Sequence, residues 1–315
     1  MRKIFLITTM LFNLLLHAQN TYQSIDNTCP VPKQINIVCD NLDRMSIGPG
    51  AYELTLGDLQ SSPRNTIIGS RAATGITTPG NVGSFYWDNT FIGAMAGSNS
   101  LKPSAHTYIG CRAGFGSNAG LIATFFANSN TYVGSDAGNT SIGGRNCFYG
   151  TFAGANSTAP ISGSTSSNNN YFGWQTGQGT IGTNNCFFGT WEMNIPPNPI
   201  ARASTNNCFF GTNAGILTNG GNNNVFMGGS SGQRNTTGSL NVFIGNSSGI
   251  NNTTGSSNIF IGNSIVNSGA GGTGNGNIYI GDQAGNTLSQ TGNNGISIGT
   301  NSRSGNISSN NALCD

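Results

Sequence analysis

A five-residue unit recurs along most of this chain and constrains its fold more than any other feature. One copy reads Asn-Val-Phe-Ile-Gly at residues 241–245, and the last copy, Gly-Ile-Ser-Ile-Gly at residues 295–299, is degenerate. A small second signal, Ala-Gly, follows six of the copies. Each apolar run that ends in Gly has the size of one strand and one turn. The thirteen copies begin at residues 65, 89, 106, 130, 146, 169, 185, 207, 224, 241, 258, 277 and 295.

The spacing of these copies predicts the fold class. Successive motif glycines lie 16 to 24 residues apart, the range for one coil of a β-solenoid. Gly occurs 48 times and only 7% of residues are charged; without a period such a composition would indicate disorder. Because the glycines punctuate β-branched and aromatic clusters, we predict an all-β chain, a β-solenoid of the parallel β-roll or β-helix type with about thirteen coils.

The first 18 residues have the pattern of a secretory signal peptide. Arg2 and Lys3 precede an apolar run that ends at Leu16-His17-Ala18, and this run is too short to remain as a membrane-spanning helix. Without Arg2 and Lys3, 10 basic residues face 10 acidic ones, so nothing attracts nucleic acid or anionic lipid. We expect a protein that is secreted or held at the cell surface, with no membrane insertion.

The remaining chain divides into four predicted segments. Residues 19–64 are expected to form an N-terminal cap, which a solenoid needs over its first coil, and residues 45–48 within it have the form of one eroded repeat. Residues 65–228 form a part with long alternate connections, and residues 229–303 a regular part. Residues 304–315 form a C-terminal tail.

The long connections of the first part bring bulky aromatic side chains into otherwise polar turns. These side chains are candidate ligand-binding residues, because aromatic rings can stack on a glycan or grip a protein partner. The alternative is that they cover the edge of the solenoid or complete a subunit contact. The candidates are Phe85, Tyr86, Trp87, Phe125, Phe126 and Trp191.

The repeat unit is apolar on both faces of its strand. Side chains alternate between faces, so Val242 and Ile244 point one way and Phe243 the other. If one face fills the coil, the other must be covered from outside. We expect the third-position aromatic residues to be this second face and to form the contact between subunits of an intertwined or side-by-side homotrimer. The predicted contact residues are Phe91, Tyr108, Tyr132, Phe148, Tyr171, Phe187, Phe209, Phe226, Phe243, Phe260 and Tyr279.

Seven cysteines in an exported chain make disulfides an open question. Cys29 and Cys39 flank a short segment of the predicted cap, where a local disulfide is one of two alternatives. Cys147, Cys186 and Cys208 occupy the second position of the repeat, where Thr, Val or Ile stand elsewhere. We expect these three to be inward-facing, unpaired space fillers rather than metal ligands or nucleophiles.

Asn at the first position of the repeat has two explanations. Stacked Asn side chains can bond to one another and to the backbone of neighbouring coils. Asn is also a common turn former, and this role alone explains part of the pattern.

No catalytic constellation is recognisable in the sequence. The only histidine after residue 18 is His106, which replaces the repeat Asn, and the carboxylates are few and scattered. A Gly-rich run at residues 271–276 is similar to a calcium-binding repeat, but Asn275 stands where that motif has Asp and only one copy is present. We therefore expect a protein that is not an enzyme and that needs no metal or cofactor.

The repeat resembles a known family. Residues 296–302, Ile-Ser-Ile-Gly-Thr-Asn-Ser, resemble the repeats in the head domains of trimeric autotransporter adhesins. The form Asn-Thr-Phe-Ile-Gly with a trailing Ala-Gly is similar to repeat-rich exported proteins of Bacteroidetes-type bacteria. The resemblance implies a trimeric left-handed β-roll with an adhesive role, although the aromatic third position and the longer repeats depart from the head motif.

These observations give a leading interpretation and one alternative. The leading interpretation is an exported structural or adhesive protein that forms a rigid, self-associating surface fibre or the head of an adhesin. The alternative is a module that binds carbohydrate or protein through the aromatic connections of residues 65–228. An enzyme that acts on polysaccharide has the weakest support.

Overall fold

The computed structural model contains strands and turns in all of its described parts. The regular part of each coil is described, whereas most of the predicted cap and the long connections are not. The described residues are 21–24, 35–39, 45–48, 64–75, 88–100, 105–117, 129–156, 167–191, 202–265, 272–285, 292–302 and 312–314.

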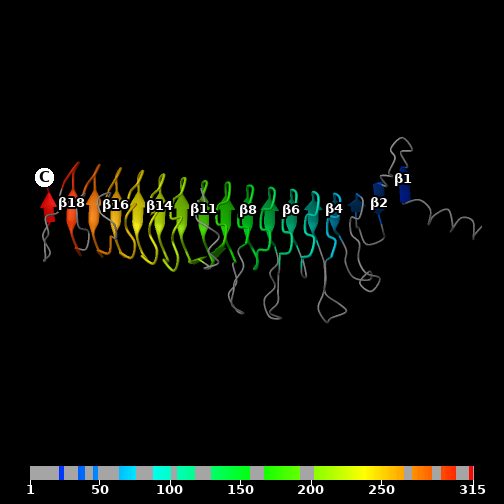
Figure 1. Ribbon diagram of the computed structural model, residues 1–315, viewed down its shortest axis with the longest axis horizontal. Coiled ribbons are helices and arrows are strands. Elements are labelled where there is room, and N and C mark those ends of the chain that lie inside the picture. The colour runs from blue at the N-terminus through cyan, green and yellow to red at the C-terminus, as the bar shows by residue number, and fades with distance from the viewer. Residues whose placement is uncertain are drawn as a thin grey trace, which may run out of the picture.

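The chain forms a β-solenoid whose strands lie side by side in one long sheet. Figure 1 shows the strands of this sheet from β3 onward as a single row of arrows that point the same way and follow one another in chain order. Seventeen strands belong to this sheet, and β10 (Thr180–Ile181) and β12 (Arg202–Ala203) form a separate pair. The seventeen are β1 (Thr21–Ser24), β2 (Ile35–Cys39), β3 (Met45–Ile47), β4 (Thr66–Ile68), β5 (Thr90–Ile92), β6 (Thr107–Ile109), β7 (Thr131–Val133), β8 (Cys147–Tyr149), β9 (Asn170–Phe172), β11 (Cys186–Phe188), β13 (Cys208–Phe210), β14 (Val225–Met227), β15 (Val242–Ile244), β16 (Ile259–Ile261), β17 (Ile278–Ile280), β18 (Ile296–Ile298) and β19 (Ala312–Cys314).

The predicted repeats coincide with the strands of this sheet. Each of the thirteen copies contains one three-residue strand, from β4 to β18, and neighbouring strands pair in parallel with equivalent repeat positions side by side. The eroded repeat is confirmed as well, because β3 pairs in parallel with β4 and places Met45 beside Thr66. Before it, β1 and β2 pair antiparallel, and β2 pairs antiparallel with β3. The parallel ladder therefore begins within the segment that was predicted to be the cap.

The third-position side chains fill the interior of the coil. All of the aromatic ones are buried, and successive rings stack with centroids 4.6 to 5.0 Å apart. The prediction that these residues form the contact between subunits is therefore wrong, because each ring is covered within its own chain. The residues to which this correction applies are Phe91, Tyr108, Tyr132, Phe148, Tyr171, Phe187, Phe209, Phe226, Phe243, Phe260 and Tyr279. We call this row of third-position side chains the inner rank.

The Ala-Gly signal forms the wall that faces the inner rank. In the coil of Phe91, Ala96 is fully buried, and a Cβ on Gly97 would lie only 2.8 Å from the Phe91 ring. The same relation holds between Gly249 and Phe243, where the added Cβ would lie 2.5 Å from the ring. The interior is thus one aromatic ring deep, and a residue with a side chain at the Gly position would displace the ring.

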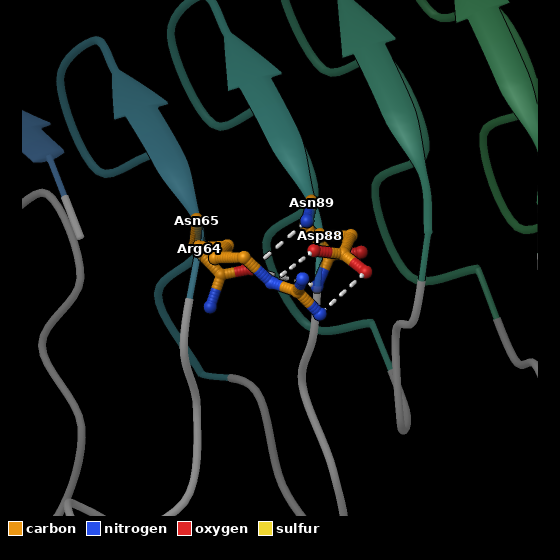
Figure 2. A network of polar contacts seen from close by, with 4 residues as sticks. All are labelled: Arg64, Asn65, Asp88 and Asn89. Atoms are coloured by element: carbon orange, nitrogen blue, oxygen red, sulfur yellow. Dashed lines mark hydrogen bonds and ion pairs between the residues drawn. The ribbon is translucent and has the colours of Figure 1, made fainter. Parts of the chain in front are cut away.

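The first-position Asn residues form a second buried ladder. The Oδ1 atom of Asn65 accepts hydrogen bonds from the backbone N–H of Asn89 at 2.9 Å and from its Nδ2 at 3.1 Å, as Figure 2 shows. Further along, Asn224 accepts a bond from the backbone N–H of Asn241 at 2.9 Å and donates from Nδ2 to the Gly238 carbonyl. The prediction of stacked, mutually bonded Asn side chains is confirmed. Because these amides are buried, the bonds supply the partners that their polar atoms would otherwise lack.

Phe209 and Phe210 offer a test of which face is the interior. Phe209 is 2% exposed and Phe210 is 55% exposed. We expect Phe209→Ala to lower the free energy of unfolding by about 3 to 5 kcal/mol through loss of burial and the cavity left behind. Phe210→Ala should cost about 1 kcal/mol or less, because half of that ring already contacts solvent. Urea unfolding followed by far-UV circular dichroism measures both, and a larger loss for Phe210→Ala would contradict the assignment.

Candidate functional site

The most distinctive surface in the described part of the chain is the side of the sheet opposite the inner rank. The second and fourth residues of every repeat point to this side, where most are half-buried or exposed. We call the two rows the second rank and the fourth rank, and together the outer face. The second rank is Thr66, Thr90, Thr107, Thr131, Cys147, Asn170, Cys186, Cys208, Val225, Val242, Ile259, Ile278 and Ile296; the fourth rank is Ile68, Ile92, Ile109, Val133, Tyr149, Phe172, Phe188, Phe210, Met227, Ile244, Ile261, Ile280 and Ile298.

Neither rank of the outer face contains a charged residue, and the fourth rank is apolar throughout apart from one phenol. Ile109, Phe188, Met227, Ile261 and Ile298 are 36 to 42% exposed. Polar groups enter the second rank as four Thr residues in the first coils and one Asn in the middle. An apolar strip of this regularity is the kind of surface that marks an interaction site.

Four outward aromatic side chains stand together in the middle of the fourth rank. Tyr149 stacks on Phe172 with centroids 5.1 Å apart, Phe172 stacks on Phe188 at 4.4 Å, and Phe188 is 5.8 Å from Phe210. The first two pairs are within 6° of parallel. The faces of the two middle rings of this stack, Phe172 and Phe188, are therefore covered by the neighbouring rings, and their edges point to solvent. The exposed Trp174 lies two residues after Phe172 on the same coil.

The three repeat cysteines lie on the outer face rather than in the interior. Cys147 and Cys186 are half-buried and Cys208 is exposed, so the prediction that they face inward is wrong. The physical reason is the alternation of the strand: once the aromatic third residue is inside, the second residue must be outside. All three thiols are free, as predicted, although Cys186 and Cys208 are direct neighbours on β11 and β13. Burial raises the pKa of Cys147 and Cys186, and Cys208 raises that of Cys186 further, so these thiols lack the activation expected of nucleophiles.

The structure corrects one of the six candidate ligand-binding residues. Trp191 is only 3% exposed, and its ring lies 5.3 Å from the Phe187 ring in the interior. It belongs to the core because its coil lacks the usual Ala-Gly wall and the indole fills that space. The other five candidates, Phe85, Tyr86, Trp87, Phe125 and Phe126, lie outside the described residues.

The cysteines of the predicted cap fall in a part of the chain of which little is described. Cys29 lies outside the described residues, and of Cys39 only the backbone of β2 is described. The disulfide between them therefore stays a prediction.

His106 and Gly295 are the two first-position residues of the thirteen copies that are not Asn. The Nδ1 atom of His106 accepts a hydrogen bond from the backbone N–H of Asn130 at 3.1 Å, and the His106 ring stacks on Tyr108 at 5.1 Å. The other ring nitrogen, Nε2, is buried without a partner among the described residues. Desolvation lowers the pKa of His106 to about 3. The imidazole is thus held neutral in the interior, where it can reach no substrate.

The buried tyrosines are equally unsuited to proton transfer. Burial raises the pKa of Tyr132 to about 12 and raises the pKa of Tyr108 and Tyr171. The Tyr108 hydroxyl shares a hydrogen bond of 3.3 Å with the Ser117 hydroxyl inside the coil. These phenols serve as parts of the ring stack.

No charged residue stands in a repeat strand of the described coils, and two ion pairs flank these strands. Arg64 and Asp88, each just before a repeat Asn, form an exposed ion pair of 2.8 Å between neighbouring coils, as Figure 2 shows. Arg112 and Asp136 form another at 3.3 Å. Exposed pairs of this kind contribute little to stability. Arg64 and Asp88 belong to the row of residues that directly precede the first position of the repeat, which also contains Asn184, Asn206 and Asn223. We call this row the polar rim.

In the described ranges, no three His, Cys, Asp or Glu side chains come together as metal ligands would. Nor does any described residue belong to a helix that could span a membrane.

The outer aromatic stack was not anticipated from the sequence, although a signal for it was present. Aromatic residues occupy the fourth position in only four of the thirteen copies, and those four are consecutive. A residue type that is confined to neighbouring coils at one lattice position indicates a local surface feature, whereas the third position is aromatic in eleven copies.

Comparison with known proteins does not add an identification. No protein-family model, no curated protein and no solved structure matches this chain.

The buried imidazole predicts a pH dependence of stability. Because the folded-state pKa of about 3 lies below the usual 6.5, only the unfolded chain binds the proton between these values, and stability falls as the pH decreases through this window. Between pH 7 and pH 5 the loss should be about 2 kcal/mol. His106→Asn, which restores the amide of the other coils, should remove this loss. Urea unfolding at both pH values measures it, and equal pH dependence in the two proteins would exclude His106 as the cause.

Proposed function

We propose that this protein is an exported structural or adhesive protein whose solenoid forms a rigid, self-associating surface fibre or the head of an adhesin. The observation that carries the proposal is the uninterrupted parallel ladder from β3 to β18, which repeats one surface along the whole rod. A protein of this form can project a constant surface over a long distance. Its repeated inward-facing side chains hold neighbouring coils together and so maintain the rod.

Three kinds of contact between neighbouring coils support the assignment of a rigid rod. Backbone hydrogen bonds join the coils outside the strands as well, as between the Gly97 N–H and the Ala113 carbonyl at 2.9 Å. The Asn ladder and the inner rank add a polar and an apolar contact at each step. Bending the rod would strain all three at once, because all repeat at the same short period.

The chemistry of the described residues supports a structural role over a catalytic one. The histidine is neutral and enclosed, the half-buried thiols have raised pKa values, and the phenols with raised pKa values are interior. Enzymes place groups with useful pKa values in accessible clefts. The groups described here are either inaccessible or not activated.

The homotrimer expected from the sequence needs a different contact from the one first assigned. The inner rank is used within the chain, so self-association has to use a surface that remains free. The outer face combines apolar side chains with exposure to solvent, and it is the natural candidate for such a contact.

Electron microscopy tests the proposed rod and its location. The purified protein without residues 1–18 should appear in negative stain as straight rods at least about 58 Å long, from twelve steps of about 4.8 Å between thirteen strands. Immunogold labelling of intact cells that produce the full chain should place it outside the cell. Round particles, or label seen only after the cells are permeabilised, would contradict the proposal.

A further inference from the structure

The outer face is large enough to form a specific interface. Twelve steps of about 4.8 Å between the thirteen strands give a length of about 58 Å, and the two ranks with their rim are about 10 to 14 Å wide. The resulting area of roughly 600 to 800 Å² approaches the surface that one partner contributes to a standard specific interface. Its apolar part reaches the size of the largest apolar patch on an ordinary soluble monomer, and such patches are often functional.

The sheet is straight enough for contact along its full length. Successive rings of the inner rank are mostly 3° to 8° from parallel, so the rod bends little from one coil to the next. Figure 1 shows the strands from β3 to β19 pointing the same way along the row, so the sheet also twists little. Ordinary sheets rotate by about 20° or more per strand, which confines the contact between two long sheets to a crossing region. Here a second straight face can follow the first from end to end.

The two ranks of the outer face are complementary in size. Where the fourth rank is largest, at Phe172, Phe188 and Phe210, the second rank holds the small residues Asn170, Cys186 and Cys208. In the later coils the fourth rank holds Ile and the second rank becomes larger, with Val or Ile. On these coils a large side chain in one rank is thus accompanied by a smaller one in the other. Two such faces can interdigitate when the large rank of one lies over the small rank of the other.

This complementarity selects one way to pack two copies. With a two-fold axis along the rod, the strands of the two copies run in opposite directions while equal coils stay level. The fourth rank of one copy then lies over the second rank of the other, so that Phe188 faces the small Cys186. With the axis along the strands, the fourth ranks would face each other and Phe188 would meet its own equivalent. The first arrangement fills the space evenly, whereas the second crowds the middle of the interface.

Other occupants fit the outer face less well. A glycan stacks on exposed ring faces, but the stacked rings present their edges. A peptide strand would pair with a free sheet edge, whereas every repeat strand is already bonded on both sides. A second copy supplies the same period, the same lack of charge and the complementary ranks.

We infer that the outer face is the interface between two copies of this chain, packed face to face about a two-fold axis parallel to the rod. Tyr149, Phe172, Phe188 and Phe210 of each copy then cover the small second-rank residues of the other. The inference rests on the proposed self-association and assigns the surface and the geometry that perform it.

Charges placed on the outer face test the interface. We expect Phe188→Asp combined with Phe210→Asp to weaken self-association at least about 100-fold, because four charges per pair would have to be buried. The matched control is Thr237→Asp combined with Thr254→Asp, which adds the same charge to exposed turn residues outside the outer face and its rim. The control should assemble like the wild type. Light scattering after size exclusion measures mass, and far-UV circular dichroism shows that both variants remain folded.

Cross-linking tests the direction of packing. Protein with Val242→Cys is mixed with protein carrying Ile244→Cys and then oxidised. The axis along the rod places these positions opposite each other, so a linked pair of chains should form. The axis along the strands would instead bring Ile244→Cys against Val133→Cys, the position at the same distance on the other side of Phe188. Wild-type protein under the same oxidation gives the background from the native thiols.

The outcomes separate this inference from the proposed function. Assembly of the Phe188→Asp, Phe210→Asp variant like the wild type would overturn the assigned surface and leave self-association intact. Cross-linking of Ile244→Cys only with Val133→Cys would overturn the assigned geometry. A wild-type protein that is monomeric at every concentration would overturn the self-association as well, and binding of that monomer to phosphatidylcholine vesicles would show that a lipid surface is the occupant.

Discussion

The whole structure depends on the stacking of equivalent side chains in an exact parallel register. Each Asn of the first position is completed by the Asn of the next coil, as in the bond of 2.9 Å from the Asn241 N–H to Asn224 Oδ1, and each inner ring is covered by the next at 4.6 to 5.0 Å. A shift by one residue would exchange the two faces of the strand, and a shift by two would place the buried amide against a ring of the next coil. The register is therefore fixed at every step by a polar and an apolar contact together. Because neither contact uses charged side chains, the small charge content of the chain is no obstacle to stability.

Much of this fold could be predicted from the sequence, because the period of the repeat and its terminal glycine are local properties of the chain. The glycine requirement is direct: Gly245 has a φ of 127°, and a Cβ there would approach the carbonyl group of Gly262 in the next coil. The direction of the side chains was harder to predict. Alternation places Phe243 opposite Val242 and Ile244, but it does not say which side is the interior when both sides are apolar.

The deciding information lay elsewhere in the repeat. Gly249 leaves room for a large ring and Ser248 lines the same wall, so only a coil with its aromatic residue inside uses that room. The uniform third position and the variable fourth position point the same way, since Phe209 has aromatic equivalents in ten other coils whereas Phe210 has them in three. The prediction that the cysteines face inward was wrong for the same reason. Side chains alternate along the strand, so Cys208 faces outward once Phe209 faces inward. Apart from the eroded repeat at residues 45–48, the predicted cap and the long connections lack the repeat, so no register follows for them from the sequence.

A straight, flat outer face also limits how copies of this chain can associate. Facing sheets pack at about 10 Å, and two parallel flat faces reach this separation over their whole area. Around a three-fold axis, three such faces meet at 60° to one another, so that only narrow parts of them approach to that distance. A homotrimer would thus leave much of Phe188 and its neighbours in contact with solvent, unless residues of the rim fill the corners. The rim supplies Asn184, Asn206 and Asn223, whose amides already bond to one another from coil to coil. Such satisfied, polar residues suit the boundary of an interface rather than its core, which favours a pair of faces as the unit from which a larger fibre is built.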